Sequence, residues 1–113
     1  MDLLKKEKEM WNNHFSGLIL EYPDEEVVRF LNRYKKRKGA GKLVDLGCGT
    51  GRHTLAAVKM GYDVTAIDFV QHCLDITKQR VDEIGKSASY ILNDNVDIPI
   101  ETGSADVVLA WGC

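Results

Sequence analysis

The chain has 113 residues, of which 44% are hydrophobic and 28% charged, a composition that predicts one compact globular domain over residues 1–113. Its formal net charge of −2 gives no overall electrostatic reason to expect nucleic-acid binding. Cys48, Cys73 and Cys113 are odd in number and widely spaced, which indicates reduced thiols in a cytoplasmic protein and no metal site. No apolar run approaches a membrane span, so neither a signal peptide nor a transmembrane anchor is expected.

Residues 1–38 are predicted to form an N-terminal helical segment. An amphipathic helix is expected over residues 2–15, with a break at Ser16 and Gly17. A second helix should start near Pro23 and Asp24 and run to about residue 36. Its inward-facing residues would be Val27, Val28, Leu31 and Tyr34.

A basic run at residues 35–38 closes this second helix. Positive charge is favourable at a helix C-terminus, and the glycines at 39 and 41 then make a linker into the first strand. This explanation is preferred to a nucleic-acid-binding patch.

Residues 43–54 place an apolar run, an acid and three alternating glycines ahead of a helix-like stretch. Leu43, Val44 and Leu46 suit a buried strand that turns tightly into a helix. Glycine accepts positive φ and leaves no Cβ between the backbone and a ligand, so a small molecule could lie against the turn.

The spacing of these glycines differs from the dinucleotide fingerprint. Counting from Gly47, the sixth position is Arg52 and not glycine, and Asp45 precedes the turn by two residues. A carboxylate there would repel a pyrophosphate but suits a cationic group such as an ammonium. A nicotinamide oxidoreductase is therefore only a distant alternative.

Three more strands and two helices follow in alternation. Strands are expected at residues 64–67, 89–92 and 107–110, with helices at 52–60 and 70–84 that end before glycines. Strands separated by such helices pair in parallel through right-handed crossovers. The sequence therefore predicts a doubly wound α/β fold.

The glycine turn with its preceding acid resembles the nucleotide-binding signature of class I S-adenosylmethionine (AdoMet)-dependent methyltransferases. The resemblance implies a Rossmann-like three-layer core over residues 42–113, with strand order 3-2-1-4 and S-adenosylhomocysteine as the product. It also implies that the turn approaches the amino-acid part of AdoMet. The residues concerned are Asp45, Gly47, Cys48, Gly49 and Gly51.

Asp68 ends the second strand, where open α/β sheets bind ligands in the crevice outside the strand ends. A carboxylate there can accept hydrogen bonds from both vicinal hydroxyls of a ribose. The alternative is a capping role for the helix that follows. Phe69 could pack on the adenine face, and a core position is the alternative.

Other sites follow from the resemblance alone. Asp94 would accept from the adenine amino group and Asn95 would present its backbone amide to the ring, although an Asn-Asp-Asn sequence by itself is an ordinary turn. Ala110 and Trp111, with the glycine after them, would border the methionine part. Asp106, at the remote end of the fourth strand, is expected to be structural.

No catalytic base can be assigned from the sequence. His14 lies in a segment that folds over the cofactor as a lid in related enzymes, and a structural role is the alternative. His53 and His72 are interpreted as local helix-terminal or surface groups. Residues 11–31 resemble the N-terminal extensions of small-molecule methyltransferases of bacterial type, which favours a small-molecule acceptor over nucleic acid or protein.

The chain departs from this family because a complete sheet has seven strands and this sequence supplies four. The resemblance thus covers the N-terminal half of a family domain. The fourth strand would have an open edge, which predicts a homodimer or another partner that covers it. The alternative to an active methyltransferase is a noncatalytic AdoMet-binding or interaction module.

Overall fold

The computed structural model describes residues 22–93 and 103–110 of the chain. The expected N-terminal helix over residues 2–15, with its break at Ser16, lies outside them. The described elements are α2 (Glu25–Lys38), β1 (Lys42–Leu46), α3 (Arg52–Lys59), β2 (Asp63–Asp68), α4 (Gln71–Glu83), β3 (Ser89–Leu92) and β4 (Val107–Leu109).

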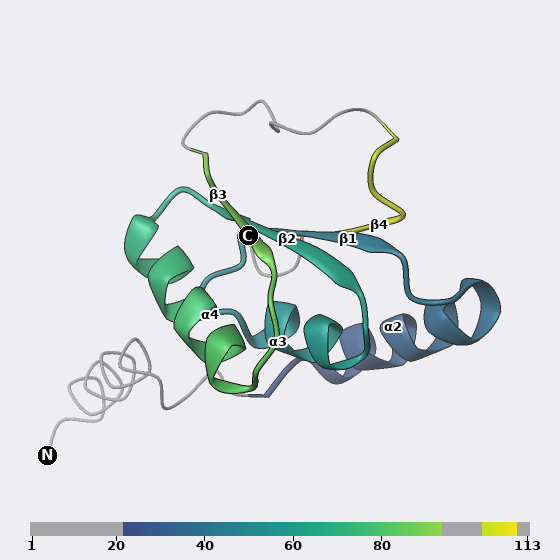
Figure 1. Ribbon diagram of the computed structural model, residues 1–113. Coiled ribbons are helices and arrows are strands. Elements are labelled where there is room, and N and C mark those ends of the chain that lie inside the picture. The colour runs from purple at the N-terminus through teal and green to yellow at the C-terminus, as the bar shows by residue number, and fades with distance from the viewer. Residues whose placement is uncertain (1–21, 94–102, 111–113) are drawn as a thin grey trace, which may run out of the picture.

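The four strands form one parallel sheet in the order β3-β2-β1-β4 (Figure 1). Leu43 of β1 lies in register with Val64 of β2 on one side and with Val107 of β4 on the other. The predicted Rossmann-like α/β fold and strand order are confirmed. Parallel pairing aligns the carboxyl ends of all four strands at one edge of the sheet, where a ligand crevice is expected.

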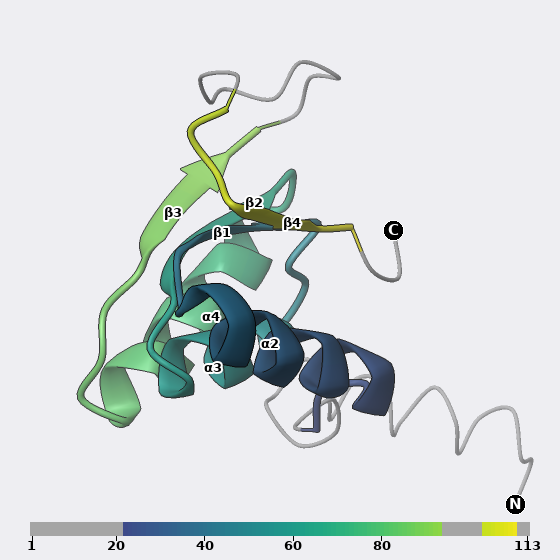
Figure 2. The ribbon, with the colours of Figure 1, turned by 90° about the vertical axis from the view of Figure 1, so that its right-hand side faces the viewer.

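All three described helices cover the same face of the sheet, as both ribbon views show (Figures 1 and 2). The larger of two core clusters lies between them, and its buried members come from the sheet and from all three helices: Val27, Leu31, Leu43, Ala57, Val58, Tyr62, Val64, Val81, Val107 and Leu109. The described residues thus supply the sheet and one helical layer. On β4, Val107 and Leu109 are buried beneath the helices, whereas the side chain between them, Val108, is 52% exposed.

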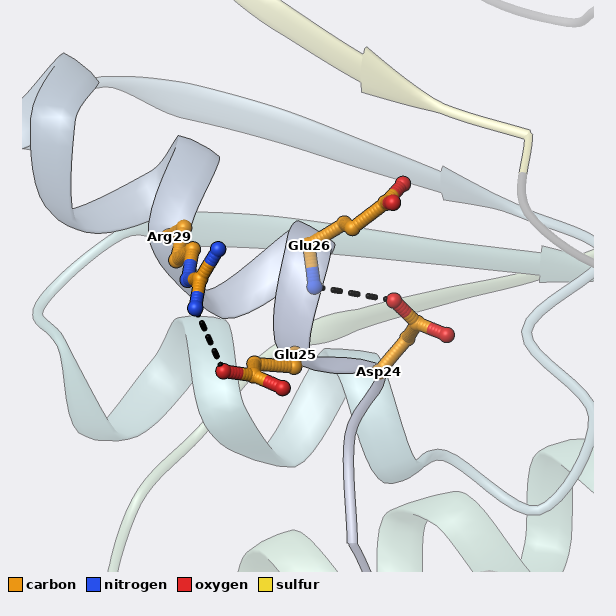
Figure 3. A network of polar contacts seen from close by, with 4 residues as sticks. All are labelled: Asp24, Glu25, Glu26 and Arg29. Atoms are coloured by element: carbon orange, nitrogen blue, oxygen red, sulfur yellow. Dashed lines mark hydrogen bonds and ion pairs between the residues drawn. The ribbon is translucent and has the colours of Figure 1, made fainter.

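Helix α2 begins and ends with the signals expected from the sequence. The Asp24 carboxylate accepts from the Glu26 amide at 2.9 Å, and Arg29 pairs with Glu25 one turn away (Figure 3). The basic residues 35–38 occupy the last turn, and Gly39 caps it at φ 80°. Because the Arg29–Glu25 pair is exposed, it adds little stability, and the helix is held mainly by burial of Val27 and Leu31.

Asp106 lies at the amino end of the sheet, remote from the glycine turn. Its backbone amide donates to the carbonyl of Lys42, and its carboxylate accepts from the Lys42 amide, both at 2.8 Å. A Cβ on Gly41 would lie 2.9 Å from the Asp106 Cγ, so only glycine leaves room for this contact. The structural role expected for Asp106 is confirmed by these bonds, which align β4 with β1.

His53 departs from the sequence expectation. It lies in the first turn of α3, as predicted, but it is only 4% exposed and is no surface group. Its Nε2 accepts a hydrogen bond from the Asp24 amide at 3.0 Å, so the proton of the neutral ring must sit on Nδ1. Burial, with a smaller contribution from neighbouring Arg52, lowers the pKa of His53 to about 4.

This buried histidine should make the stability of the fold depend on pH. Between pH 6.5 and 4 the unfolded chain binds a proton at residue 53 that the folded chain does not, so the folded state loses stability as pH falls through this range. We expect wild type to lose on the order of 1 to 2 kcal/mol of unfolding free energy between pH 7.5 and 5.0, measured by urea denaturation.

His53→Gln keeps a side-chain acceptor without the titration, and the loss should shrink in this variant. His72→Gln is the matched control because His72 is exposed on α4, and it should behave like wild type. An unchanged loss in His53→Gln would contradict the assignment.

Candidate functional site

The turn between β1 and α3 is built from three glycines with left-handed backbones. Their φ angles are 72° at Gly47, 57° at Gly49 and 89° at Gly51. The amides of Gly47 and Cys48 donate to the carbonyl of Ile67 at 2.8 and 3.1 Å, which attaches the turn to the end of β2. Side chains with a Cβ are strained in this conformation, so the alternating glycines are a requirement of the backbone.

The Asp68 carboxylate joins this turn to the start of α4. One oxygen accepts from the Gly49 amide at 2.9 Å and the other from the Val70 amide at 2.9 Å. Helix α4 begins at Gln71, and its N-cap residue is Val70. The alternative prediction, that Asp68 is the N-cap, is therefore wrong. The Asp68 carboxylate instead forms a local turn by accepting from the amide two residues ahead. Two oxygens offer about four acceptor positions, and these two bonds within the described residues use two of them, which leaves capacity for a ligand's hydroxyls.

Helix α4 packs directly beneath the turn through Thr77. A Cβ on Gly51 would lie 2.7 Å from the methyl carbon of Thr77, closer than nonbonded atoms allow. The Thr77 hydroxyl lies 3.0 Å from the Gly49 carbonyl, and Arg80 donates to the Thr50 carbonyl at 2.8 Å. The sequence analysis missed Thr77 and Arg80 because they stand a full strand and helix away from the turn, with no motif of their own.

Gly49 differs from Gly51 in what lies around it. A Cβ at Gly49 would meet no heavy atom within 4 Å, so this backbone faces open space. The turn therefore presents a bare stretch of peptide immediately before α3, whose N-terminus has no side-chain cap. A ligand can approach the backbone here, and uncapped amides at a helix start favour an anionic or polar group.

Asp45 is buried beneath the turn, with 2% of its surface exposed. Its carboxylate accepts from the Thr54 hydroxyl at 2.6 Å, a bond between the end of β1 and the first turn of α3. Burial raises the pKa of Asp45, and the Thr54 hydrogen bond opposes that rise while the Asp68 carboxylate adds to it. A buried acid at this place is costly unless a partner, such as a ligand cation, compensates it.

Cys48 is one of the candidate residues, but its side chain points into the interior. It packs with Ala66 and Leu74, and its sulfur lies 3.7 Å from the Thr77 hydroxyl. Burial raises the pKa of the Cys48 thiol to about 12, so it is not a nucleophile at neutral pH. Cys48 can contact a ligand only through its backbone.

The remaining candidates divide by position. Phe69 is 72% exposed directly after β2, so the alternative of a core role is wrong. Ala110 is exposed and follows β4, which pairs with β1 and ends at the same edge of the sheet. Asp94, Asn95 and Trp111 lie outside the described residues, as does His14.

The described part of the chain offers neither a metal site nor a membrane-spanning helix. In residues 22–93 and 103–110, no group of three His, Cys, Asp or Glu side chains is arranged to hold a metal ion. In the same residues, no helix is both long and apolar enough to cross a membrane.

Comparison with known proteins places this chain in a family. A family model described as "Methyltransferase domain" matches residues 43–113. An uncharacterized methyltransferase of Mycobacterium tuberculosis is 33% identical over 93 residues, covering 80% of this chain and 35% of the relative. A probable cobalt-precorrin-6B C(15)-methyltransferase of Methanobrevibacter smithii is 31% identical over 83 residues, covering 73% of this chain and 41% of the relative.

A solved structure shows the same fold. The tRNA (uracil-54, C5)-methyltransferase of Pyrococcus abyssi, in complex with S-adenosyl-L-homocysteine, superposes with a TM-score of 0.58 at 16% identity, over 74% of this chain and 21% of that one. The chain spans less than half the length of the curated relatives it matches. By its matched domain and its sheet order, the chain belongs to the class I AdoMet-dependent methyltransferase family.

Proposed function

We propose that this chain binds AdoMet and supplies the methyl-donor site of a methyltransferase. The observation that carries the proposal is the pairing of Gly49 and Asp68. The bare Gly49 backbone leaves room for a ligand, and the Asp68 carboxylate beside it retains acceptor capacity for ribose hydroxyls. The cofactor brings the activated methyl group, so the protein chiefly binds and orients.

Each described residue has a distinct role in this proposal. The turn from Gly47 to Gly51 lies against the amino-acid portion, and Asp45 favours its ammonium group from beneath. Asp68 holds the ribose, and exposed Phe69 packs against the adenine. Ala110, at the end of β4, borders the methionine part.

Four residues outside the described part complete the proposed assignment. Asp94 and Asn95 would read the adenine, and Trp111 would border the methionine portion beside Ala110. Within residues 1–38, the stretch around His14 would act as a lid over the cofactor. These roles rest on the order of motifs along the chain and on its family.

We propose a small molecule as the methyl acceptor. The similarity of residues 11–31 to extensions of small-molecule methyltransferases supports this choice. So does the M. smithii relative, whose name gives a cobalt-precorrin as its methyl acceptor. When bound, AdoMet would supply an activated methyl group for this acceptor, with S-adenosylhomocysteine as the product. The two buried thiols, Cys48 and Cys73, suit a reducing compartment, and we propose the cytoplasm.

A noncatalytic AdoMet-binding or interaction module is the second candidate. Every role proposed above for a described site residue concerns cofactor binding, and a module of this kind needs no other. Both candidates require AdoMet binding, so methyl transfer in a screen of acceptors separates them.

Titration calorimetry tests the proposal directly. AdoMet and S-adenosylhomocysteine should bind, and NAD should not. Asp68→Asn should weaken AdoMet by at least about tenfold, because loss of charge-assisted hydrogen bonds costs roughly 1.5 to 3 kcal/mol. Thermal unfolding must accompany the variant, since Asp68 also holds the turn. A folded Asp68→Asn protein with wild-type AdoMet affinity would refute the ribose assignment.

A pair of glycine substitutions tests the open backbone at the turn. Gly49 and Gly85 both have positive φ, at 57° and 70°, and a Cβ at either meets no atom within 4 Å. Gly49→Ala and Gly85→Ala should therefore destabilise the fold similarly, by about 1 kcal/mol. Only Gly49→Ala should weaken AdoMet, by roughly tenfold or more, because its methyl group would occupy the ligand's space. Equal affinities in the two variants would contradict close backbone approach.

We propose that β4 is covered by a second copy of the chain. In the described residues β4 pairs only with β1, so its outer edge is unpaired, and Val108 is half exposed beside that edge. Sedimentation should show a dimer that Val108→Lys converts to monomer, whereas Thr65→Lys, on an inner strand of the sheet, should leave the association intact. A wild-type monomer over a wide concentration range would exclude this arrangement.

A further inference from the structure

A groove lies between α2 and α3 on the helical layer, and it begins at Arg52, directly after the glycine turn. It has a volume of about 250 Å³. Pro23 and Val28 line it from the side of α2, and Leu55, Ala56 and Met60 line it from α3. Its size and apolar walls suit hydrophobic side chains better than ordered water, which needs several polar partners.

The chain enters the described structure beside this groove. The backbone bends at Tyr22, whose carbonyl accepts from Arg52 at 3.4 Å, and Arg52 also lines the groove. Two residues later, the Asp24 amide donates to His53. Contacts from the first turn of α3 thus fix the backbone on both sides of Pro23, so the residues before Tyr22 must depart from this point.

Immediately before Tyr22 the sequence reads Leu18-Ile19-Leu20-Glu21. We propose that the apolar residues 18–20 fold back along α3 and fill the groove. Leu20 is three residues before Pro23 and Leu18 is five, a reach of roughly 10 to 18 Å for an extended chain. The groove runs along α3 from Arg52 to Met60, about 12 Å at 1.5 Å per residue, so the segment can cover it.

Charge and tethering both favour this occupant over a separate molecule. Arg52 and Lys59 add positive charge to the groove lining. This charge is complementary to the acidic Glu21, which stands between residues 18–20 and Tyr22. A segment attached two residues from the groove has a high effective concentration there, so modest apolar burial suffices to hold it. The docking does not require AdoMet, and it is independent of the proposed function.

Disulfide trapping in the full-length protein tests the docking. Cysteine is placed singly at positions 18, 19 and 20, each together with Ala56→Cys, in a Cys113→Ser background without cofactor. Ala56 is partly buried in the groove and tolerates a small side chain. At least one pair should form an intramolecular disulfide at least tenfold faster than the same segment cysteine paired with Gln79→Cys, an exposed position on α4.

Two results would overturn the proposal. Cross-linking no faster than in the Gln79→Cys controls would mean that residues 18–20 do not lie in the groove. Disulfides that appear only between two chains, as dimers on a nonreducing gel, would mean that a second copy fills it. Hydrogen exchange of β1 and β2 verifies that each variant is folded, and hydrogen exchange of residues 18–21 in wild type should show protection that Ala56→Glu removes.

Discussion

The Asp68 carboxylate is the constraint on which the site depends. It accepts from Gly49 in the turn and from Val70 ahead of α4, so a single side chain at the end of β2 fixes two segments at once. Because the same carboxylate is the proposed ribose ligand, the group that shapes the site is also the one that would read the cofactor. Its acceptor capacity permits both roles, which explains how the turn can be preorganised before a ligand arrives.

The packing of α4 against the turn limits which residues can stand in the turn. Gly51 must lack a Cβ because Thr77 occupies that space, while Gly49 lacks one and leaves its space open. Two glycines in one motif therefore differ: Gly51 is required by its packing against α4, and we propose that Gly49 leaves space for the ligand. Asp45 is buried beneath the same turn, and burial of its carboxylate costs free energy. The hydrogen bond from the Thr54 hydroxyl offsets part of that cost. The remaining cost is consistent with a carboxylate kept for a cationic ligand.

Much of this fold is predictable from the sequence because local and global signals agree. Apolar runs predicted the strands, and the run at residues 89–92 coincides with β3. The predicted helices differ from the observed ones by one or two residues at their ends. The position of Asp68 among the carboxyl ends of the strands also follows from the sequence, because it ends a predicted parallel strand. Contacts between distant elements do not follow, because they depend on side-chain direction in three dimensions. Thus the place of Cys48 in the turn could be predicted but the inward direction of its side chain could not, and Thr77 carried no signal at all.

His53 shows most clearly why sequence reading fell short. A histidine in the first turn of a helix is ordinarily solvated, and only the approach of the chain around Asp24 buries it. The consequence extends beyond one residue, because α3 starts at the glycine turn and its first two residues, Arg52 and His53, hold the backbone of Tyr22 and Asp24. A displacement of the first turn of α3 would therefore act on the backbone at residues 22–24. The first turn of α3 thus follows directly after the glycine turn and also contacts the backbone of Tyr22 and Asp24.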